Sequence, residues 1–346
     1  MTAFFISTAN LSGGLRSPIL RLQTELARAQ HEATTGVSAD AGLELGARSG
    51  RIVSMRAEAT RLTALVESNS VTITRLTTTQ SALGNLGDIA RSFRDALLGA
   101  SQGDPSARAA LRRQSEGQLA QVLSTLNANA GGRYLLSGVE SDIAPMRGAA
   151  DGTQAMTDAF VAAFGAAPDA AASNAIDGAG LRAFARGAAA DLFDDAHWRA
   201  DWSAVGDTPT RSRIAPDELI ESSAGANAPA IRKLVQALTM IGALGTQSLN
   251  TEASQALTSE AASLTADAIG GLTRMSAEVG AASQRVNAAS DRMGARIALI
   301  TSDVDHLEGV DAYEAATRVA RLQTQLQASF SMTAQLRGLN LFDHLT

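Results

Sequence analysis

A repeating series of residues at alternating steps of three and four constrains the fold of this chain more than any other feature. Because this spacing matches the facing positions of a left-handed helix pair or bundle, it predicts one helix from about 47 to about 99. Such a helix would be roughly 80 Å long at ~1.5 Å per residue, well beyond an ordinary globular helix. The series consists of Ile52, Met55, Ala59, Leu62, Val66, Asn69, Ile73, Leu76, Gln80, Leu83, Gly87 and Ala90.

A second series of the same kind occupies the other half of the chain and predicts a second very long helix. Its many alanines permit close approach of a neighbouring helix. The positions are Leu257, Ala261, Leu264, Ala268, Met275, Val279, Ala282, Val286, Ala289, Met293, Ile300, Val304 and Leu307.

Two polar residues, Asn69 and Gln80, interrupt the first series. A buried polar residue in a helix pair fixes the register, whereas a polar residue at the edge of the seam remains in contact with water. Both interpretations are open from the sequence, and we slightly favour contact with water for both residues.

Shorter helices with apolar stripes are predicted near both ends of the chain. Ser17 and Pro18 have the form of an N-cap followed by a first-turn proline. Asp311 and Glu314 have the form of a capping box that opens the last helix. The plan is therefore nearly symmetric, with a short helix and a long helix on either side of the middle.

Between about 139 and 228 the heptad pattern is lost, and glycine, alanine and aspartate become frequent. Both tryptophans and most of the prolines lie in or directly beside this stretch. Frequent glycine and proline are typical of short elements and turns. We expect a small mixed α/β domain inserted into a mainly α fold, which is otherwise a long antiparallel helical bundle or coiled-coil rod made from both chain ends.

Composition argues against several function classes. The chain has no cysteine and is 4% aromatic, Lys233 is its one lysine, and its formal net charge is -6. Without cysteine, no thiolate chemistry is available. The sequence also has no row of basic residues that could bind along a nucleic-acid backbone. No apolar stretch is long enough for a membrane span, and the N-terminus does not have the pattern of a cleaved signal peptide.

The sequence offers no catalytic or cofactor motif. His31 and Glu32 do not continue into a zinc-protease pattern, and no phosphate-binding loop is present. Asp191, Asp194, Asp195 and His197 form the one acidic and histidine cluster, and a solvated loop or helix end is a much better interpretation of it than a metal site. We therefore expect a protein that is not an enzyme and has no cofactor, metal or catalytic residue.

Two segments resemble the bacterial flagellin family. One is the run that begins Gly131-Gly132-Arg133-Tyr134 and ends at Gly138, directly after a predicted helix. The other is the tail, from Asp311 through Phe330 to Leu339-Asn340-Leu341-Phe342-Asp343. With Ile6-Ser7-Thr8 and the region 52–98, the resemblance covers roughly the first 140 and the last 120 residues.

The resemblance implies a structural subunit of the flagellum that joins hook to filament. The filament flagellin of the same family is the alternative, and a signalling coiled-coil receptor rod is a remote one. The implied organisation is a terminal helical inner layer (1–42 with 307–346), a long-helix core rod (43–138 with 229–306) and an inserted outer domain (139–228).

The resemblance also implies that the protein is extracellular in the flagellum and is secreted unfolded without a cleaved signal peptide, with an export chaperone at the C-terminal helix. Its implied partners are copies of itself in a ring or helical layer, another hook-associated protein and flagellin, but neither nucleic acid nor a membrane. The residues expected to form the assembly interface are Leu20, Leu22, Leu26, Leu322, Leu326, Phe330, Leu336, Leu339 and Phe342.

Overall fold

The computed structural model describes residues 8–39, 49–100 and 105–342, with side chains from 17 to 39, 49 to 100 and 106 to 335. The chain divides into two compact units. One consists of residues 1–64 with 293–346, and the other consists of residues 65–292. The protein is mainly helical, with long helices packed against one another and two small sheets, so the predicted fold class is confirmed.

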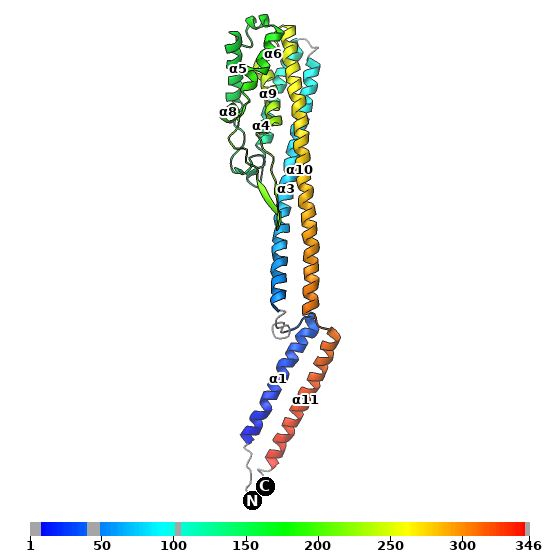
Figure 1. Ribbon diagram of the computed structural model, residues 1–346. Coiled ribbons are helices and arrows are strands. Elements are labelled where there is room, and N and C mark those ends of the chain that lie inside the picture. The colour runs from blue at the N-terminus through cyan, green and yellow to red at the C-terminus, as the bar shows by residue number, and fades with distance from the viewer. Residues whose placement is uncertain (1–7, 40–48, 101–104, 343–346) are drawn as a thin grey trace. The chain divides into compact units, whose positions relative to one another are not determined.

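The two heptad series form the two longest helices of the described chain, α3 (Ser49–Ala100) and α10 (Thr251–Glu308). They lie side by side within each unit (Figure 1). In the larger unit, stripe residues Leu76 and Leu83 of α3 and Val279 and Val286 of α10 are buried, as the heptads predict. In the smaller unit the ion pair between Arg296 of α10 and Glu58 of α3 joins the same two helices.

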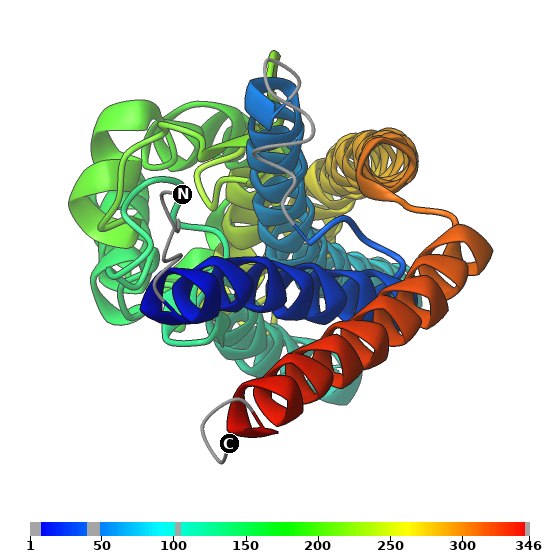
Figure 2. The same cartoon turned by 90° about the horizontal axis from the view of Figure 1, so that it is seen from below.

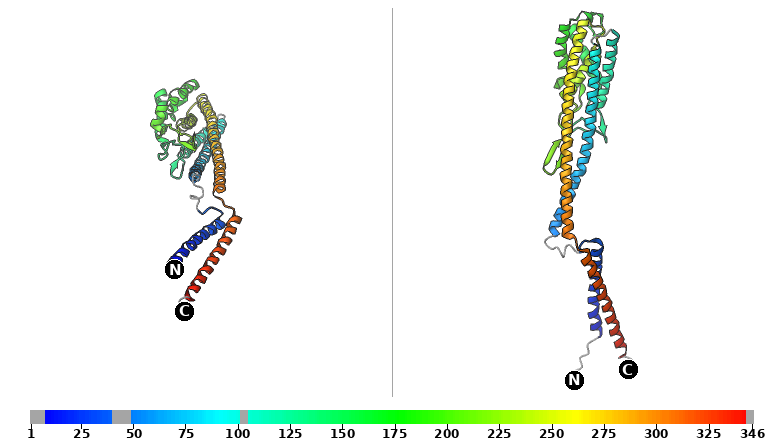
Figure 3. Two further views of the ribbon diagram at one scale, coloured as in Figure 1. Left: turned by 60° about the horizontal axis from the view of Figure 1, so that its bottom comes forward. Right: turned by 90° about the vertical axis from the view of Figure 1, so that its right-hand side faces the viewer.

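The terminal helices α1 (Thr8–Thr35) and α11 (Ala312–Phe342) lie side by side in the smaller unit (Figure 1, Figure 2 and Figure 3). Asp311 Oδ1 accepts hydrogen bonds from the backbone N–H groups of Tyr313 and Glu314, so the Asp311 half of the predicted capping box is confirmed. The Glu314 carboxylate pairs with Arg318 of the same helix at 3.5 Å. The predicted start at Ser17 and Pro18 is wrong, since α1 already begins at Thr8 and Pro18 lies inside it. A proline removes only one helical hydrogen bond, and the helix continues across it.

Helix α9 (Pro229–Leu244) is the centre of the larger unit. Buried residues follow one another around its whole circumference from Ile231 to Leu244, with only Arg232 and Lys233 less buried. A helix that is apolar on every side is stable only when it is covered on every side. Helices α4 (Pro105–Leu126) and α5 (Ala150–Phe164) pack directly against it.

The middle of the chain is built from short elements, as its turn residues predict. A two-residue turn at Gly131 and Gly132, both with positive φ, joins the first pair of antiparallel strands. The second antiparallel hairpin contacts α10 through ion pairs of Glu218 with Arg285 and Arg292. The elements are β1 (Asn129–Ala130), β2 (Arg133–Tyr134), η2 (Ala171–Ala175), α6 (Gly178–Arg186), α7 (Ala188–Asp191), α8 (Asp195–His197), η3 (Trp198–Trp202), β3 (Arg211–Ala215) and β4 (Glu218–Glu221).

The two ends of the predicted insert are adjacent. Ala226 N donates to Leu136 O at 2.9 Å, and Ser137 and Gly225 form an antiparallel bridge. Side chains from the insert, such as Phe160 and Trp202, belong to the same hydrophobic core as residues of α3 and α9. The boundaries of the insert as a separate domain stay a prediction.

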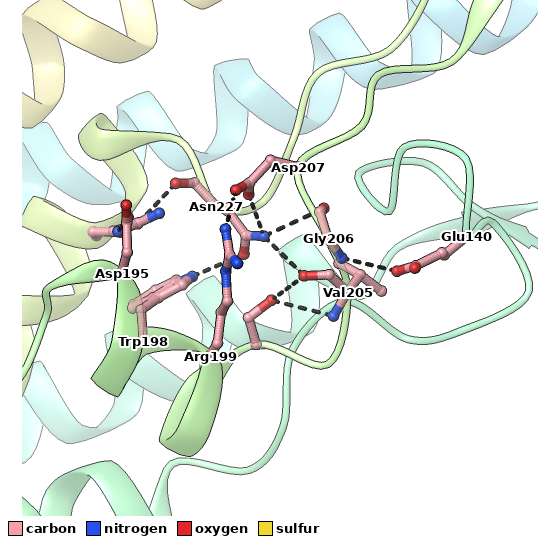
Figure 4. A network of polar contacts seen from close by, with 10 residues as sticks. Glu140, Asp195, Trp198, Arg199, Val205, Gly206, Asp207 and Asn227 are labelled. Atoms are coloured by element: carbon pink, nitrogen blue, oxygen red, sulfur yellow. Dashed lines mark hydrogen bonds and ion pairs between the residues drawn. The ribbon is translucent and has the colours of Figure 1, made fainter.

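A polar network around Asn227 holds the insert together (Figure 4). Asn227 Oδ1 accepts from the indole N–H of buried Trp198 at 2.8 Å, and Asn227 Nδ2 donates to Asp207 at 2.8 Å. Asp207 also pairs with Arg199 at 2.6 Å. The polar groups enclosed around Trp198 are thereby satisfied, which is the condition for burying them.

The acidic and histidine cluster serves helix ends and an ion pair. Asp194 accepts from the His197 N–H at 2.8 Å and so caps α8, while Asp195 pairs with Arg232 of α9. Within the described residues, no group of three or more potential metal ligands lies together. This arrangement agrees with the interpretation of these residues as a helix end.

Candidate assembly interface

The seam between α1 and α11 holds the apolar stripes of both terminal helices. Ala29 of α1 and Ala315 and Leu322 of α11 are buried in it. Leu22, Leu26 and Leu326 are half-buried. These spacings of three, four and seven residues follow from the helical period, which returns a side chain to the same face after one or two turns.

Other large apolar side chains of the same helices point to solvent. Leu20 of α1 is 62% exposed, and Phe330 and Met332 of α11 are 48% and 64% exposed. Two helices that pack side by side cover only one stripe on each other, so apolar residues elsewhere on their surface stay exposed in the isolated subunit. Leu20, Phe330 and Met332 are exposed apolar residues that a partner would cover, and we call them the exposed apolar group.

The predicted interface residues thus divide into two sets. Leu22, Leu26, Leu322 and Leu326 take part in the packing of α1 on α11, while Leu20 and Phe330 belong to the exposed apolar group. The last three predicted residues lie in the helical backbone of α11, but their side chains are outside the described part of the chain: Leu336, Leu339 and Phe342.

Sequence reasoning missed a buried charge in this pair of helices. Glu32 of α1 is 5% exposed, and its carboxylate pairs with Arg318 of α11 at 3.1 Å. The backbone N–H of Ala39 donates to the same carboxylate at 3.3 Å. The signal in the sequence is the position of Glu32, which continues the apolar stripe of Leu26 and Ala29 by one further step of three.

The connections that follow α1 and precede α11 are joined by backbone hydrogen bonds. Ser38 N donates to Glu308 O at 2.9 Å, and Val310 N donates to Gly36 O at 2.9 Å. Gly36 has a φ of 71°, a conformation that favours glycine. Beside this bridge, the buried carboxylate of Glu308 pairs with Arg56 of α3 at 2.5 Å. The base of the α1–α11 pair is therefore held by both backbone and ionic contacts.

No helix in the described part of the chain combines the length and the hydropathy needed to cross a membrane. The surface presented by α1 and α11 has apolar side chains at some positions and exposed polar side chains such as Gln23 and Gln327 at others. This mixture is typical of a protein–protein contact surface.

Two family models match the chain. The N-terminal helical region of bacterial flagellin matches residues 6–141, and the C-terminal helical region of bacterial flagellin matches residues 262–345. Together the two matches cover more than half of the chain, including α1, α3, α11 and most of α10. They also include the Gly131-to-Gly138 segment and the tail on which the resemblance in the sequence was based.

Two solved structures are similar to this chain at low sequence identity. A structure of a putative flagellar hook-associated protein from Vibrio parahaemolyticus is similar with a TM-score of 0.53 and 10% identity, over 75% of this chain and 97% of that one. The crystal structure of Bacillus cereus FlgL is similar with a TM-score of 0.48 and 12% identity, over 73% of this chain and 98% of that one.

A comparison with curated proteins finds no match. The family assignment therefore rests on the two helical regions. The N-terminal region of flagellin matches the N-terminal part of this chain, and the C-terminal region matches the C-terminal part. The chain belongs to the bacterial flagellin family, a family of structural proteins of the flagellum.

Proposed function

We propose that this protein is a structural subunit at the junction between the flagellar hook and the filament, and that it assembles through α1 and α11. The observation that carries the proposal is the exposed apolar group: Leu20, Phe330 and Met332. The packing of α1 against α11 leaves these three side chains in contact with water. The described residues present no metal cluster, and no enzymatic role is proposed.

Burial of this group supplies the energy for assembly. Complete removal of one large apolar side chain from water contributes about 1.5–3 kcal/mol. Several such groups in each subunit, repeated around a ring or helical layer, give a cooperative contact. Copies of this chain, another hook-associated protein and flagellin are the partners that we propose for these contacts.

The similarity of the fold to a solved structure supports the junction over the filament as the place of this protein. The similar structure from Vibrio parahaemolyticus is described as a putative flagellar hook-associated protein, and this chain covers almost the whole of it. The filament subunit is the second candidate, because the two family models that match are those of flagellin itself. The two roles differ in copy number, since a filament contains very many subunits and a junction only about one ring.

Export follows from the same assignment. We propose that the chain leaves the cell unfolded through the flagellar secretion channel, without a cleaved signal peptide. A chaperone would hold the C-terminal helix before export. Phe330 and Met332 are exposed apolar residues of α11, and a chaperone that surrounds this helix would cover them.

The test is a double substitution, Leu20→Asp with Phe330→Asp, in the bacterium that makes the protein. Both side chains are exposed, so the change removes contact surface without opening the α1–α11 seam. The matched control is Gln23→Asp with Gln327→Asp, which adds the same two charges at exposed polar positions of the same helices. Electron microscopy of hooks and filaments and assay of flagellin in the medium give the result.

If the protein forms the junction, the apolar double variant should make hooks without filaments and release flagellin into the medium. The control should make normal filaments. Normal filaments in both strains would show that the exposed apolar group does not assemble the junction. Hooks without filaments and without released flagellin would instead identify the chain as the filament subunit.

A further inference from the structure

Two nearly buried carboxylates lie close to helix ends in the smaller unit. Glu32, in the last turn of α1, is 5% exposed, and Glu308, the last residue of α10, is 6% exposed. Glu32 pairs with Arg318 of α11 at 3.1 Å, whereas Glu308 pairs with Arg56 of α3 at 2.5 Å. One ion pair therefore joins the two terminal helices, and the other joins the two long helices.

Two backbone hydrogen bonds from consecutive residues connect these ion pairs. Ala39 N donates to the carboxylate of Glu32 at 3.3 Å. The preceding residue, Ser38, donates from its backbone N–H to the backbone oxygen of Glu308 at 2.9 Å. These contacts belong to the antiparallel pairing of residues 36–39 with residues 308–310, which we call the connecting bridge.

Separation of α1 from α11 would leave Glu32 as a nearly buried charge without its arginine. A charge in that state is costly until water reaches it. Hydration of the carboxylate requires the residues around it to move apart, and Ala39 is one of them. Because Ser38 is the next residue in the chain, this movement also weakens its hydrogen bond to Glu308.

The same argument holds from the side of the long helices. Without Arg56, Glu308 would be a nearly buried charge, and its hydration would draw the end of α10 away from Ser38. The packing of this end is part of the same unit, since Ile52 of α3 and Val304 of α10 are buried there. Each ion pair therefore depends on the connecting bridge that the other one also needs.

We propose that the connecting bridge couples the packing of α1 on α11 to the packing of the adjoining ends of α3 and α10, so that the two helix pairs loosen together. The contacts run without a gap from Arg318 to Arg56, as such coupling requires. A partner that covers α1 and α11 would thus also order the ends of α3 and α10. That consequence rests on the proposed function, whereas the coupling within one subunit does not.

Hydrogen exchange of the purified full-length chain, followed by mass spectrometry, tests the coupling with Arg318→Ala. Residues 49–60 and 296–308 do not contact Arg318 in any ion pair, yet we expect them to exchange about fivefold faster, at the lower end of the range for coupled sites. Exchange in α9 should not change, because α9 belongs to the larger unit. The control Arg321→Ala removes an exposed arginine of the same helix and should alter neither region.

The coupling must also act in the opposite direction. Arg56→Ala should therefore make residues 17–35 and 312–335 exchange faster by about the same factor. Arg51→Ala, at an exposed position of α3, is the matched control and should leave these residues as they are.

A substitution in the connecting bridge itself tests the route. Ser38→Pro removes the N–H that donates to Glu308, whereas Ser38→Ala keeps it. We expect Ser38→Pro to make both helix pairs exchange faster and Ser38→Ala to change them much less.

Faster exchange of residues 17–35 in Arg318→Ala, with residues 49–60 and 296–308 unchanged, would overturn the coupling. An equal acceleration in α9 would overturn it too, because the variant would then have lost stability throughout. If Ser38→Pro affected one helix pair only, the connecting bridge would not be the link between them. Absence of the protein from sheared flagella would instead overturn the proposed function and leave these measurements on the isolated subunit valid.

Discussion

Asn69 of α3 and Ser290 of α10 are joined by a hydrogen bond of 3.0 Å between Asn69 Nδ2 and Ser290 Oγ. The same Nδ2 donates to the backbone oxygen of Ile214 in β3 at 2.9 Å. Asn69 is 1% exposed, so one buried amide connects both long helices and the second hairpin. The two hydrogen bonds of Nδ2 can form in only one register of the helices, although the Oδ1 atom of the same amide is buried without a hydrogen-bond partner.

We expect Asn69→Ala to lower the free energy of unfolding by about 1–3 kcal/mol, because the change opens a small cavity and removes two hydrogen bonds. Asn287→Ala, at an exposed position of α10, is the control and should change it by less than about 0.5 kcal/mol. Urea unfolding followed by circular dichroism measures both. Equal effects of the two substitutions would rule out a structural role for the buried amide.

The sequence predicted the helices well and the buried polar groups poorly. The heptad series predicted the bounds of α3 to within a few residues and the existence of α10, because burial of a helical stripe depends on local periodicity. Contact with water was the favoured interpretation of both polar residues in the first series. It is right for Gln80, which is exposed, and wrong for Asn69. The partners that bury Asn69 come from α10 and β3, more than a hundred residues away in the sequence.

The same limit applies to the candidate assembly interface. The apolar stripes of α1 and α11 were predictable from their spacing, but the division into seam residues and exposed residues was not, since it depends on which face each helix turns to the other. Buried Glu32 was missed for the same reason, because Arg318 lies 286 residues further along the chain. The exposed apolar group follows from the structure alone.

Arg318→Ala should weaken the packing of α1 on α11. Glu32 would keep only the hydrogen bond from Ala39 N and would remain a nearly buried charge without its partner. Loss of one partner of a fully buried pair costs about 3–5 kcal/mol, and the cost is lower here because the Arg318 side chain is 38% exposed. Hydrogen exchange of residues 17–35 and 312–335 should become faster in this variant.

Two further variants make that measurement specific. Arg321→Ala removes an exposed arginine of α11 that forms no ion pair among the described residues, so the exchange rates should not change. Glu32→Gln in the Arg318→Ala background neutralises the buried charge and should restore part of the protection. If the double variant exchanged faster than the single one, the buried charge would not be the cause.

Asp207 should make the stability of the larger unit depend on pH. The hydrogen bond from Asn227, assisted by Arg199, lowers the pKa of Asp207 from its ordinary value, although partial burial opposes the shift. A carboxyl group with a lowered pKa in the folded state stabilises the fold above its unfolded pKa of about 3.9. That contribution is lost as the pH falls through the lower, folded pKa.

We therefore expect Asp207→Asn to reduce the urea midpoint at pH 7 and to have a much smaller effect near pH 3. Asp217→Asn, at the exposed turn of the second hairpin, has no ion pair among the described residues and should show neither effect. A difference between wild type and Asp207→Asn that stayed constant from pH 7 to pH 3 would contradict the titration of Asp207 as its origin.

Replacement of residues 139–228 by a short Gly and Ser linker tests the predicted domain organisation. The linker has little distance to span, because Leu136 and Ala226 are hydrogen-bonded and Ser137 lies opposite Gly225. The long helices do not depend on the insert for their periodicity, so the far-ultraviolet circular dichroism should remain helical. Stability should fall, however, since the deletion removes α5 from the surface of α9 and leaves apolar residues of α9 in water.

We expect one cooperative unfolding transition at a lower urea concentration, together with increased binding of a hydrophobic dye. Loss of the helical signal would show that 139–228 is part of the folding unit of the long helices and not a domain inserted between them.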